Sequence, residues 1–473
     1  MVFSSVIFLI WFLPVFLIIY YLAPRKAKNA VVLLASLFFY AWGAPKFIFI
    51  LVGTIVIDFY LVKGIYYSKD ERLRSLLLTF SLLISVGILL YFKYVNFFLD
   101  NVAIVLSKFG MDSPHWTRIA LPIGISFFTF QKITYAIDIY RKRTGPTRNV
   151  ADYLLYVIMF PQLIAGPIVR FNTIARQIDE RSASYPDRIH GFVRFCIGLA
   201  KKVILANTLG ETADLIFDGS LSSLSTADAW LGLLAYSFQI YYDFAGYSDM
   251  AIGLGKMIGF TFPENFNSPY LSGSISEFWR RWHMTLGQWM RDYLYIPLGG
   301  NRVNTKSRLY LNLWIVFLIS GLWHGASWNF VIWGVYHGLF LVLDRLFLLR
   351  LLKKAGRFPA VTFTFLISIL GWVFFRLEHF RDAMTYFERL FSFSFQQESE
   401  YWNAGIAGTL LLSMIFGWIT ASRAGRKLEV FFYRSPARMR HKMSHMIIAV
   451  VLYLISLAFI VGSNYNPFIY FRF

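Results

Sequence analysis

Long, unbroken apolar runs are the feature of this sequence that most restricts its fold. Residues 6–22, 76–98 and 446–462 form three of them, and their side chains do not alternate between apolar and polar. About 20 such residues in a helix cross a hydrocarbon core of about 30 Å, whereas a transmembrane barrel needs alternating strands of about ten residues. The runs therefore predict an all-α, polytopic integral membrane protein.

Composition and charge agree with a lipid bilayer as the environment. Hydrophobic residues make up 57% of the chain and charged residues 15%, against about 25% charged residues in soluble domains. The net charge of +20 includes clusters at residues 25–28, 141–143 and 423–442, which the positive-inside rule places in the cytoplasm. No segment offers the basic face of a soluble nucleic-acid-binding module, so we expect no nucleic-acid partner.

The order of apolar runs and basic clusters predicts a topology. No internal repeat or low-complexity tract is visible, and we expect one integral domain over residues 1–473. The N-terminus lacks the basic region and cleavage site of a signal peptide, so the first run should be retained. The positive-inside rule then gives about ten to twelve membrane segments, with both termini extracytoplasmic.

Three apolar runs in the middle of the chain are interrupted. Residues 153–169 contain two prolines and a glycine, residues 192–205 contain two lysines, and residues 231–247 contain an aspartate. Broken helices are tolerated at membrane depth only where protein or a cavity covers them. We predict partial or tilted segments around a central cavity, although ordinary helix kinks also explain the prolines and glycine.

Position in the chain separates the eight histidines into two groups. Five fall in loops, where a solvated side chain is expected: His115, His190, His379, His441 and His445. The other three, His283, His324 and His337, fall near or within apolar segments.

His324 is the strongest candidate for a catalytic group. A helix from Leu309 to Gly321 rises only about 20 Å at 1.5 Å per residue, so the turn at residues 321–325 should lie inside the bilayer zone. A buried, neutral imidazole can serve as a general base near neutral pH. A histidine that only packs against a neighbouring helix is the alternative, and we interpret His337 in that way.

A second histidine, His283, ends a segment that is both aromatic and cationic. It follows Trp279, Arg280, Arg281 and Trp282. The segment is too charged to span a bilayer and predicts an interfacial or re-entrant helix, with its arginines toward water and its tryptophans toward lipid. The arginines suit an anionic donor such as a nucleotide-phosphate cofactor, and anchoring to lipid headgroups explains them equally well.

Several familiar catalytic motifs are missing from the sequence. It contains no His-Glu-x-x-His, Cys-x-x-Cys or phosphate-binding Gly-Lys-Ser/Thr pattern, and no Gly-x-Ser-x-Gly nucleophile elbow. The single cysteine, Cys196, lies in an apolar run. We therefore expect no metal, and a histidine base acting on an incoming hydroxyl is the simplest scheme for acyl transfer.

Five motifs together resemble the membrane-bound O-acyltransferase (MBOAT) superfamily, in particular its bacterial alginate O-acetyltransferase branch. They are LPIGISFF at 121–128, LIAGP at 163–167, DFAGYSDMAIG at 243–253, EFWRRWH at 277–283 and GLWHGA at 321–326. The resemblance covers almost the whole chain. It implies a ring of tilted and broken helices around a central tunnel, with His283 and His324 as the signature pair and His324 as the catalytic member.

The resemblance also implies a reaction and its participants. A cytoplasmic donor, acetyl-CoA, would supply an acetyl group that crosses the bacterial cell (inner) membrane and O-acetylates an extracytoplasmic polysaccharide. An extracytoplasmic, esterase-fold (SGNH-type) O-acetyltransferase would be the partner. Two alternatives stay open: a carrier-protein-dependent D-alanyl transferase for teichoic acid, and a non-enzymatic transporter or flippase.

The extracytoplasmic C-terminal tail, residues 463–473, carries one more resemblance. Its last residues, NPFIYFRF at 466–473, resemble the C-terminal Phe-Ile-Tyr-Phe motif of the small peptide that accompanies the teichoic-acid D-alanyl transferase. The resemblance implies that Tyr470 carries the acyl group. A phenol, with a pKa of about 10, loses its proton more easily than an alcohol. An aromatic anchor at the membrane interface is the alternative.

Overall fold

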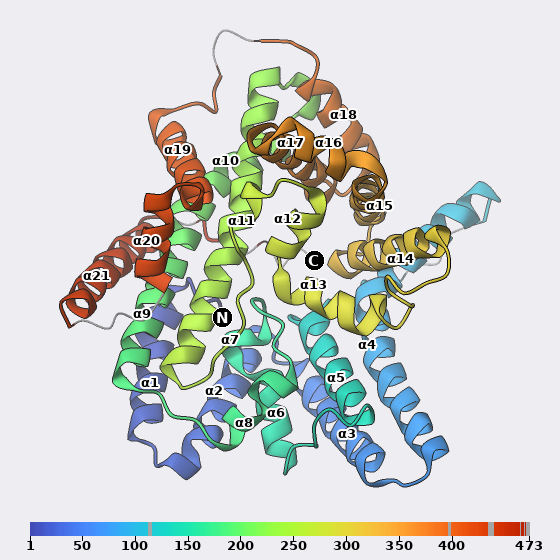
Figure 1. The fold of residues 1–473 in the computed structure, drawn as a ribbon, viewed down its shortest axis with the longest axis vertical. Coiled ribbons are helices and arrows are strands. Elements are labelled where there is room, and N and C mark those ends of the chain that lie inside the picture. Colours follow the sequence, from blue (N-terminus) through green and yellow to red (C-terminus); the bar gives the residue numbers. More distant parts are fainter. Residues whose placement is uncertain (112–115, 396–398, 434–438, 464, 468, 470–473) are drawn as a thin grey trace. The chain divides into compact units, whose positions relative to one another are not determined.

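The computed structural model describes residues 1–111, 116–395, 399–433, 439–463, 465–467 and 469 (Figure 1). Every regular element among them is a helix, which confirms the predicted all-α class. The chain divides into two compact units. Unit 1 comprises Met1–Ser184 with Ile258–Phe262, and unit 2 comprises Tyr185–Met257 with Pro263–Phe473.

Unit 1 contains eight α-helices and two short helices of other types. They are η1 (Ile7–Phe12), α1 (Leu13–Leu22), η2 (Arg25–Ala27), α2 (Lys28–Gly43), α3 (Ile48–Tyr67), α4 (Glu71–Lys108), α5 (Ile125–Tyr140), α6 (Val150–Ile158), α7 (Phe160–Leu163) and α8 (Phe171–Asp179).

Unit 2 begins with two long helical stretches and continues with shorter helices. They are α9 (Tyr185–Ala200), η3 (Lys201–Asn207), α10 (Thr208–Phe217), η4 (Leu221–Ser223), α11 (Thr226–Met257), η5 (Pro269–Leu271), α12 (Ile275–Arg281), α13 (Met284–Met290), η6 (Arg291–Tyr295), α14 (Lys306–His324), α15 (Trp328–Leu343), η7 (Asp344–Leu348), α16 (Leu349–Ala355), α17 (Arg357–Arg376), α18 (Phe380–Leu390), α19 (Ala404–Trp418), η8 (Ile419–Ala421), α20 (Arg423–Tyr433) and α21 (Met439–Gly462).

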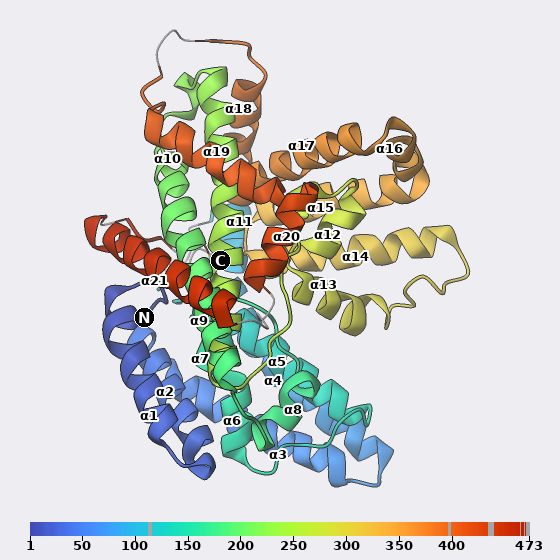
Figure 2. The same cartoon turned by 60° about the vertical axis from the view of Figure 1, so that its left-hand side comes forward.

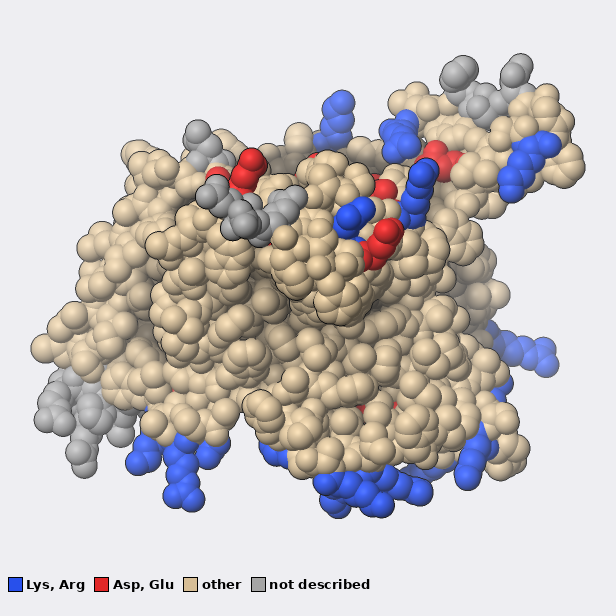
Figure 3. All heavy atoms as spheres, turned by 90° about the horizontal axis from the view of Figure 1, so that it is seen from above, with Lys and Arg blue, Asp and Glu red and all other residues tan. Residues whose placement is uncertain are grey.

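Six helices in the described part of the chain are long and apolar enough to cross a membrane. They are Ile48–Tyr67, Glu71–Lys108, Trp328–Ala355, Arg357–Arg376, Ala404–Ala421 and Met443–Gly462. Figure 3 shows broad areas of surface on which no Lys, Arg, Asp or Glu is exposed, as a lipid-facing protein requires. The chain is therefore a multi-pass membrane protein, and the predicted total of ten to twelve membrane segments stays a prediction.

The expected break in residues 153–169 is confirmed within unit 1. Helix α6 ends at Ile158, α7 ends at Leu163, and the buried chain that follows is not helical. The hydroxyl of Ser36 accepts a hydrogen bond of 3.0 Å from the Phe160 N–H, a donor freed by the break. Non-helical backbone survives in such a setting because protein covers it and supplies hydrogen-bond partners.

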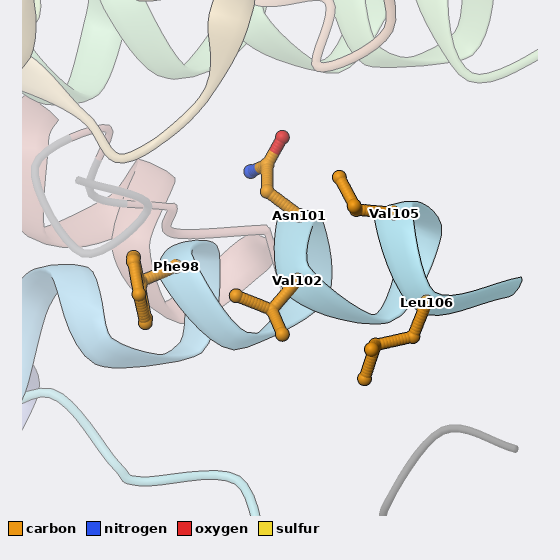
Figure 4. A pocket seen from close by; sticks show the side chains of 5 residues that line it. All are labelled: Phe98, Asn101, Val102, Val105 and Leu106. Atoms are coloured by element: carbon orange, nitrogen blue, oxygen red, sulfur yellow. The ribbon is translucent and has the colours of Figure 1, made fainter. Parts of the chain in front are cut away.

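Helix α4 of unit 1 carries a shallow pocket. Figure 4 shows its lining, which is Phe98, Asn101, Val102, Val105 and Leu106. All five side chains come from one helix, and none of them is ionisable. The pocket therefore offers no group for acid–base or nucleophilic chemistry.

In unit 2, α9 and α11 run side by side (Figure 1 and Figure 2). Their backbones approach closely at two pairs of glycines. A Cβ on Gly191 would lie 2.6 Å from the Gly253 oxygen, and one on Gly198 would lie 2.5 Å from the Gly246 oxygen. Both distances are too short for a side chain. Small residues at such contacts let two helix backbones approach closely, which explains the glycines within the 243–253 motif.

The two lysines at 201 and 202 do not interrupt their helix, contrary to our prediction. The chain stays helical from α9 to α10 and changes over Lys201–Asn207 into the π-helix η3. A π-helix forms i→i+5 hydrogen bonds and is common at functional sites. The polar side chains are accommodated because they find buried partners, as described below.

Candidate active site

Three histidines of unit 2 are linked through two tryptophan rings. The ring centroids of His283 and Trp323 are 6.1 Å apart, and those of Trp323 and His324 are 4.9 Å apart. Trp333 then lies 5.1 Å from His324 and 5.0 Å from His337. All three histidines are at most 5% exposed. The structure therefore brings the predicted pair, His283 and His324, around a shared aromatic neighbour.

His324 is the last residue of α14, one helical turn beyond the predicted end at Gly321. The Gly325 N–H closes the helix by donating to the Gly321 oxygen at 3.3 Å. After a short turn, α15 packs back against α14. A Cβ on Gly321 would lie 2.3 Å from the oxygen of Phe330 in α15, so the two helices meet closely just before His324.

His283 is held in a defined orientation by Asn265. Its φ of 43° and ψ of 54° place it in the left-handed region, between α12 and α13. Its Nδ1 lies 3.1 Å from the Asn265 Oδ1, which also accepts hydrogen bonds from the N–H and hydroxyl of Thr285 at 3.3 and 2.8 Å. The Asn265 Nδ2 donates to Ser248 at 3.1 Å. This network assigns the proton of the neutral imidazole to Nδ1.

The other ring nitrogen of His283 offers a lone pair that can accept a hydrogen bond. Its Nε2 is buried and has no hydrogen-bond partner among the described residues. The ring packs at 4.6 Å, edge to face, against Phe244. Burial lowers the pKa of His283 from its ordinary value of 6.5 to about 3, so the imidazole is neutral at physiological pH.

The predicted role of the two tryptophans as lipid-facing groups is wrong. Trp282 is buried and lies 4.9 Å from the ring of Trp372. Trp279 lies 5.3 Å from Trp333 and 4.9 Å from His337. Both rings complete the aromatic core around the histidines, where they pack edge to face or tilted against other rings.

The two neighbouring arginines differ in their surroundings. Arg280 is exposed. Arg281 is partly buried and forms an ion pair of 2.8 Å with Glu277, one helical turn earlier. Arg280 therefore has more freedom than Arg281 to meet an anionic ligand.

His337 occupies the core as a packing group. It is fully buried on α15, and neither of its ring nitrogens has a hydrogen-bond partner among the described residues. Its contacts are aromatic, from Trp279, Trp333 and Tyr336. These contacts agree with the structural interpretation of this residue.

The C-terminal tail enters the core of unit 2. Tyr470 lies outside the described residues, but its neighbour Ile469 is 6% exposed and belongs to the same hydrophobic cluster as Trp282 and Trp333. The Ile469 N–H donates to the Oδ2 of Asp243 at 3.0 Å. The tail therefore comes back to the cluster whose Trp333 packs against His324.

Sequence reasoning missed the polar residues that organise this region. Asn265 orients His283, and Lys202 forms a buried ion pair of 2.9 Å with Asp243. Asp243 lies in a recognised motif, yet the motif gave it no role. Asn265 lies in a loop, where an asparagine carries no distinguishing signal.

The arrangement can perform acid–base chemistry in a protected setting. Neutral imidazoles surrounded by aromatic rings can accept a proton from a hydroxyl group, and exclusion of water strengthens the electrostatic interactions inside the site. Among the described residues, no group of three or more His, Cys, Asp or Glu is placed to hold a metal ion.

Comparisons with known proteins show the family to which the chain is similar. The model of MBOAT, the membrane-bound O-acyltransferase family, matches residues 141–377, a range that includes His283 and His324. The probable alginate O-acetylase AlgI of Pseudomonas putida is 40% identical over 495 residues, which cover 100% of both chains. AlgI of Pseudomonas aeruginosa is 42% identical, over 93% of this chain and 84% of the relative. The peptidoglycan O-acetyltransferase of Helicobacter pylori is 34% identical, over 100% and 98%.

Proposed function

Because this chain belongs to the membrane-bound O-acyltransferase family, we propose that it O-acetylates an extracytoplasmic polysaccharide with an acetyl group from a cytoplasmic donor, acetyl-CoA. It is a membrane-bound acyltransferase. Relatives that align over the whole chain are named for the O-acetylation of alginate and of peptidoglycan, which supports an acetyl group and a glycan acceptor. The bacterial inner membrane is the proposed location, with both termini extracytoplasmic.

The proposed chemistry is acyl transfer from a thioester to a hydroxyl. His324 removes the hydroxyl proton, and the oxygen attacks the acetyl carbonyl carbon. The new C–O bond forms as the C–S bond breaks, and the departing thiolate takes up a proton to leave as a free thiol. The observation that supports this assignment is the position of His324, a buried imidazole at the end of α14 within an aromatic framework.

His283 has a supporting role in this proposal. Its Nδ1 proton is directed to Asn265, so its Nε2 offers a lone pair rather than a proton. A lone pair can accept a hydrogen bond but cannot polarise a carbonyl oxygen. We therefore assign His283 to positioning the donor or the acceptor hydroxyl. Among the donor-binding candidates, Trp279 and Trp282 are assigned to the aromatic surroundings of the donor, and Arg280 and Arg281 to its anionic part.

Tyr470 is the proposed first acceptor. The acetyl group would form an ester with its phenolic oxygen, and a serine of an extracytoplasmic SGNH-type partner would then displace the phenolate and pass the acetyl group to the glycan. The entry of the tail as far as Ile469 into the cluster around Trp333 supports this step. A phenolate leaves more readily than an alkoxide because its conjugate acid has the lower pKa.

The test is the acetyl content of the cell-surface polysaccharide. Cells that lack the gene are complemented with the wild-type protein, with His324→Ala or with His337→Phe, and base-labile acetate is measured in purified glycans. The proposal predicts acetate with the wild type and with His337→Phe, and none with His324→Ala. Alanine esters in place of acetate would favour the D-alanyl transferase, and full acetylation by His324→Ala would remove the catalytic role of that residue.

A further inference from the structure

A buried ion pair in unit 2 includes none of the histidines. The Lys202 Nζ on η3 is 2.9 Å from the Oδ1 of Asp243 on α11, and the two side chains are 3% and 2% exposed. Removing two charges from water is costly unless their remaining hydrogen-bonding capacity is also satisfied. The groups that form hydrogen bonds with Lys202 and Asp243 therefore indicate the function of the pair.

Three groups surround the Lys202 ammonium, which has three N–H donors. They are the Asp243 carboxylate, the Oδ1 of Asn207 at 2.7 Å and the backbone oxygen of Pro467. Asn207 lies five residues after Lys202 in the π-helix, and an i→i+5 spacing brings such residues together. One of the three partners is thus the C-terminal tail.

The carboxylate of the pair also binds the tail. The second oxygen of Asp243, Oδ2, accepts a hydrogen bond of 3.0 Å from the Ile469 N–H. Asn207 adds two longer contacts through its Nδ2, at 3.4 Å to the Tyr465 oxygen and 3.3 Å to the Asn466 side chain. The backbone groups held in this way belong to residues 465, 467 and 469.

We propose that Lys202, Asp243 and Asn207 form a docking clamp that holds the C-terminal tail and fixes its register. Lys202 and Asp243 bind backbone groups of the tail, and Asn207 adds the one side-chain contact, to Asn466. The clamp holds the residue directly before Tyr470. These three are positioning residues, and their link to acyl transfer rests on the proposed role of Tyr470.

The neighbouring lysine provides a natural comparison. Lys201 forms an ion pair of 2.7 Å with Asp249, six residues after Asp243 on the same helix. Asp249 is also paired with Arg194 at 2.8 Å, and Arg194 reaches Glu264 as well. Among the described residues, the further partners of Lys201 and Asp249 are Arg194 on α9 and Tyr433 on α20, and none of these contacts is with the tail. Two similar ion pairs therefore differ in their connection to the tail.

The experiment compares hydrogen exchange in two double variants of the full-length protein. Lys202→Met with Asp243→Leu replaces the clamp by apolar side chains, a change that buried ion pairs often tolerate without loss of stability. Lys201→Met with Asp249→Leu is the matched control, in which Arg194 keeps Glu264. Exchange is followed by mass spectrometry in the peptide that begins near residue 463, without any acyl donor.

The clamp predicts that this peptide exchanges at least about tenfold faster in the first variant, since hydrogen bonds to charged groups are worth about 1.5–3 kcal/mol. The control should exchange as the wild type does. Equal exchange in all three proteins would overturn the clamp. The variant Ile469→Pro, which removes the N–H that Asp243 accepts together with the buried isoleucine side chain, should also speed exchange in this peptide, and an unchanged rate would equally overturn the clamp.

A second measurement separates the clamp from the proposed function. The same proteins are incubated with acetyl-CoA, and the acetyl adduct on the tail is quantified. Loss of the adduct in the Lys202/Asp243 variant, together with faster exchange, supports a positioning role. Faster exchange with no adduct even on the wild-type tail supports docking and overturns the acyl-carrier role of Tyr470.

Discussion

The close contact between α14 and α15 leads to a prediction about Gly321→Ala. The added Cβ would lie 2.3 Å from the Phe330 oxygen, 0.7 Å inside the 3.0 Å that real Cβ contacts respect, and 3.3 Å from the Cα of Gly334. The obstacle is backbone, so it cannot move aside as a flexible side chain would. The helices must therefore separate by about 0.7 Å at a point three residues before His324.

A displacement of this size should lower the rate of acetyl transfer. A misplacement of about 1 Å at a catalytic group can cost about 10²-fold in rate, so we expect Gly321→Ala to lose roughly 10- to 100-fold in acetyl transfer. The assay is thiol release from acetyl-CoA by purified protein, with the amount of folded protein checked by gel filtration in detergent.

Gly87→Ala on α4 is the matched control for this change. A Cβ at Gly87 meets nothing within 4 Å, and alanine favours a helix over glycine by about 1 kcal/mol, so both activity and folding should be preserved. A Gly321→Ala protein as active as the Gly87→Ala protein would refute the argument that the α14–α15 contact positions His324.

Three further predictions concern single residues. His324→Ala should reduce acetyl transfer by about 10²- to 10⁴-fold, the usual contribution of a general base. His337→Phe should retain activity, because the ring nitrogens of His337 have no hydrogen-bond partner among the described residues. Thiol release measures both variants, and equal losses of activity would contradict the assignment of His324 as the base. Burial lowers the pKa of His283 from 6.5 to about 3, so as the pH falls the unfolded chain takes up a proton on this residue before the folded protein does. The contribution of His283 to the free energy of unfolding should therefore be complete above about pH 6.5 and decrease between about pH 6.5 and 3. In thermal melts His283→Gln should reduce this dependence of stability on pH, and an unchanged dependence would count against a neutral, buried His283. Gly124→Ala should lower the melting temperature of the protein, because Gly124 has a φ of 76° and a Cβ there would lie 2.6 Å from the Leu163 oxygen; a melting temperature equal to that of the wild type would be inconsistent with that contact.

Much of the fold follows from the sequence, because lipid imposes strong rules on it. Apolar runs without alternation predict helices, and the structure has helices where the runs lie, as with α3 and α17. The break near Pro161 was also predictable, since proline removes a backbone donor. The continuity through Lys201 and Lys202 was not, because a buried charge is tolerated only when distant residues supply its partners.

The site was predictable as a set of residues rather than as an arrangement. Resemblance and depth selected His283 and His324, but the orientation of His283 depends on Asn265, which is 18 residues away in sequence. The tryptophans at 279 and 282 illustrate the same limit. An aromatic residue beside arginines suits a membrane interface and a protein core equally well, and only tertiary packing distinguishes them.

The contacts of the tail with η3 and α11 could not be predicted from the sequence. Pro467 and Lys202 are 265 residues apart in sequence, and Ile469 and Asp243 are 226 apart. Both contacts use backbone atoms of the tail, so no pattern of side chains in residues 463–473 predicts them. A motif resemblance pointed to Tyr470, and the residues that hold its neighbour became visible only in the folded chain.

The most direct test of the account is mass spectrometry of the C-terminal peptide after purified protein is incubated with acetyl-CoA. The account predicts an added acetyl group on Tyr470 in the wild type, its absence in Tyr470→Phe, and its absence in His324→Ala. An acetyl adduct that forms equally well in His324→Ala, or a wild-type tail that never gains one while the protein still acetylates its glycan, would contradict it.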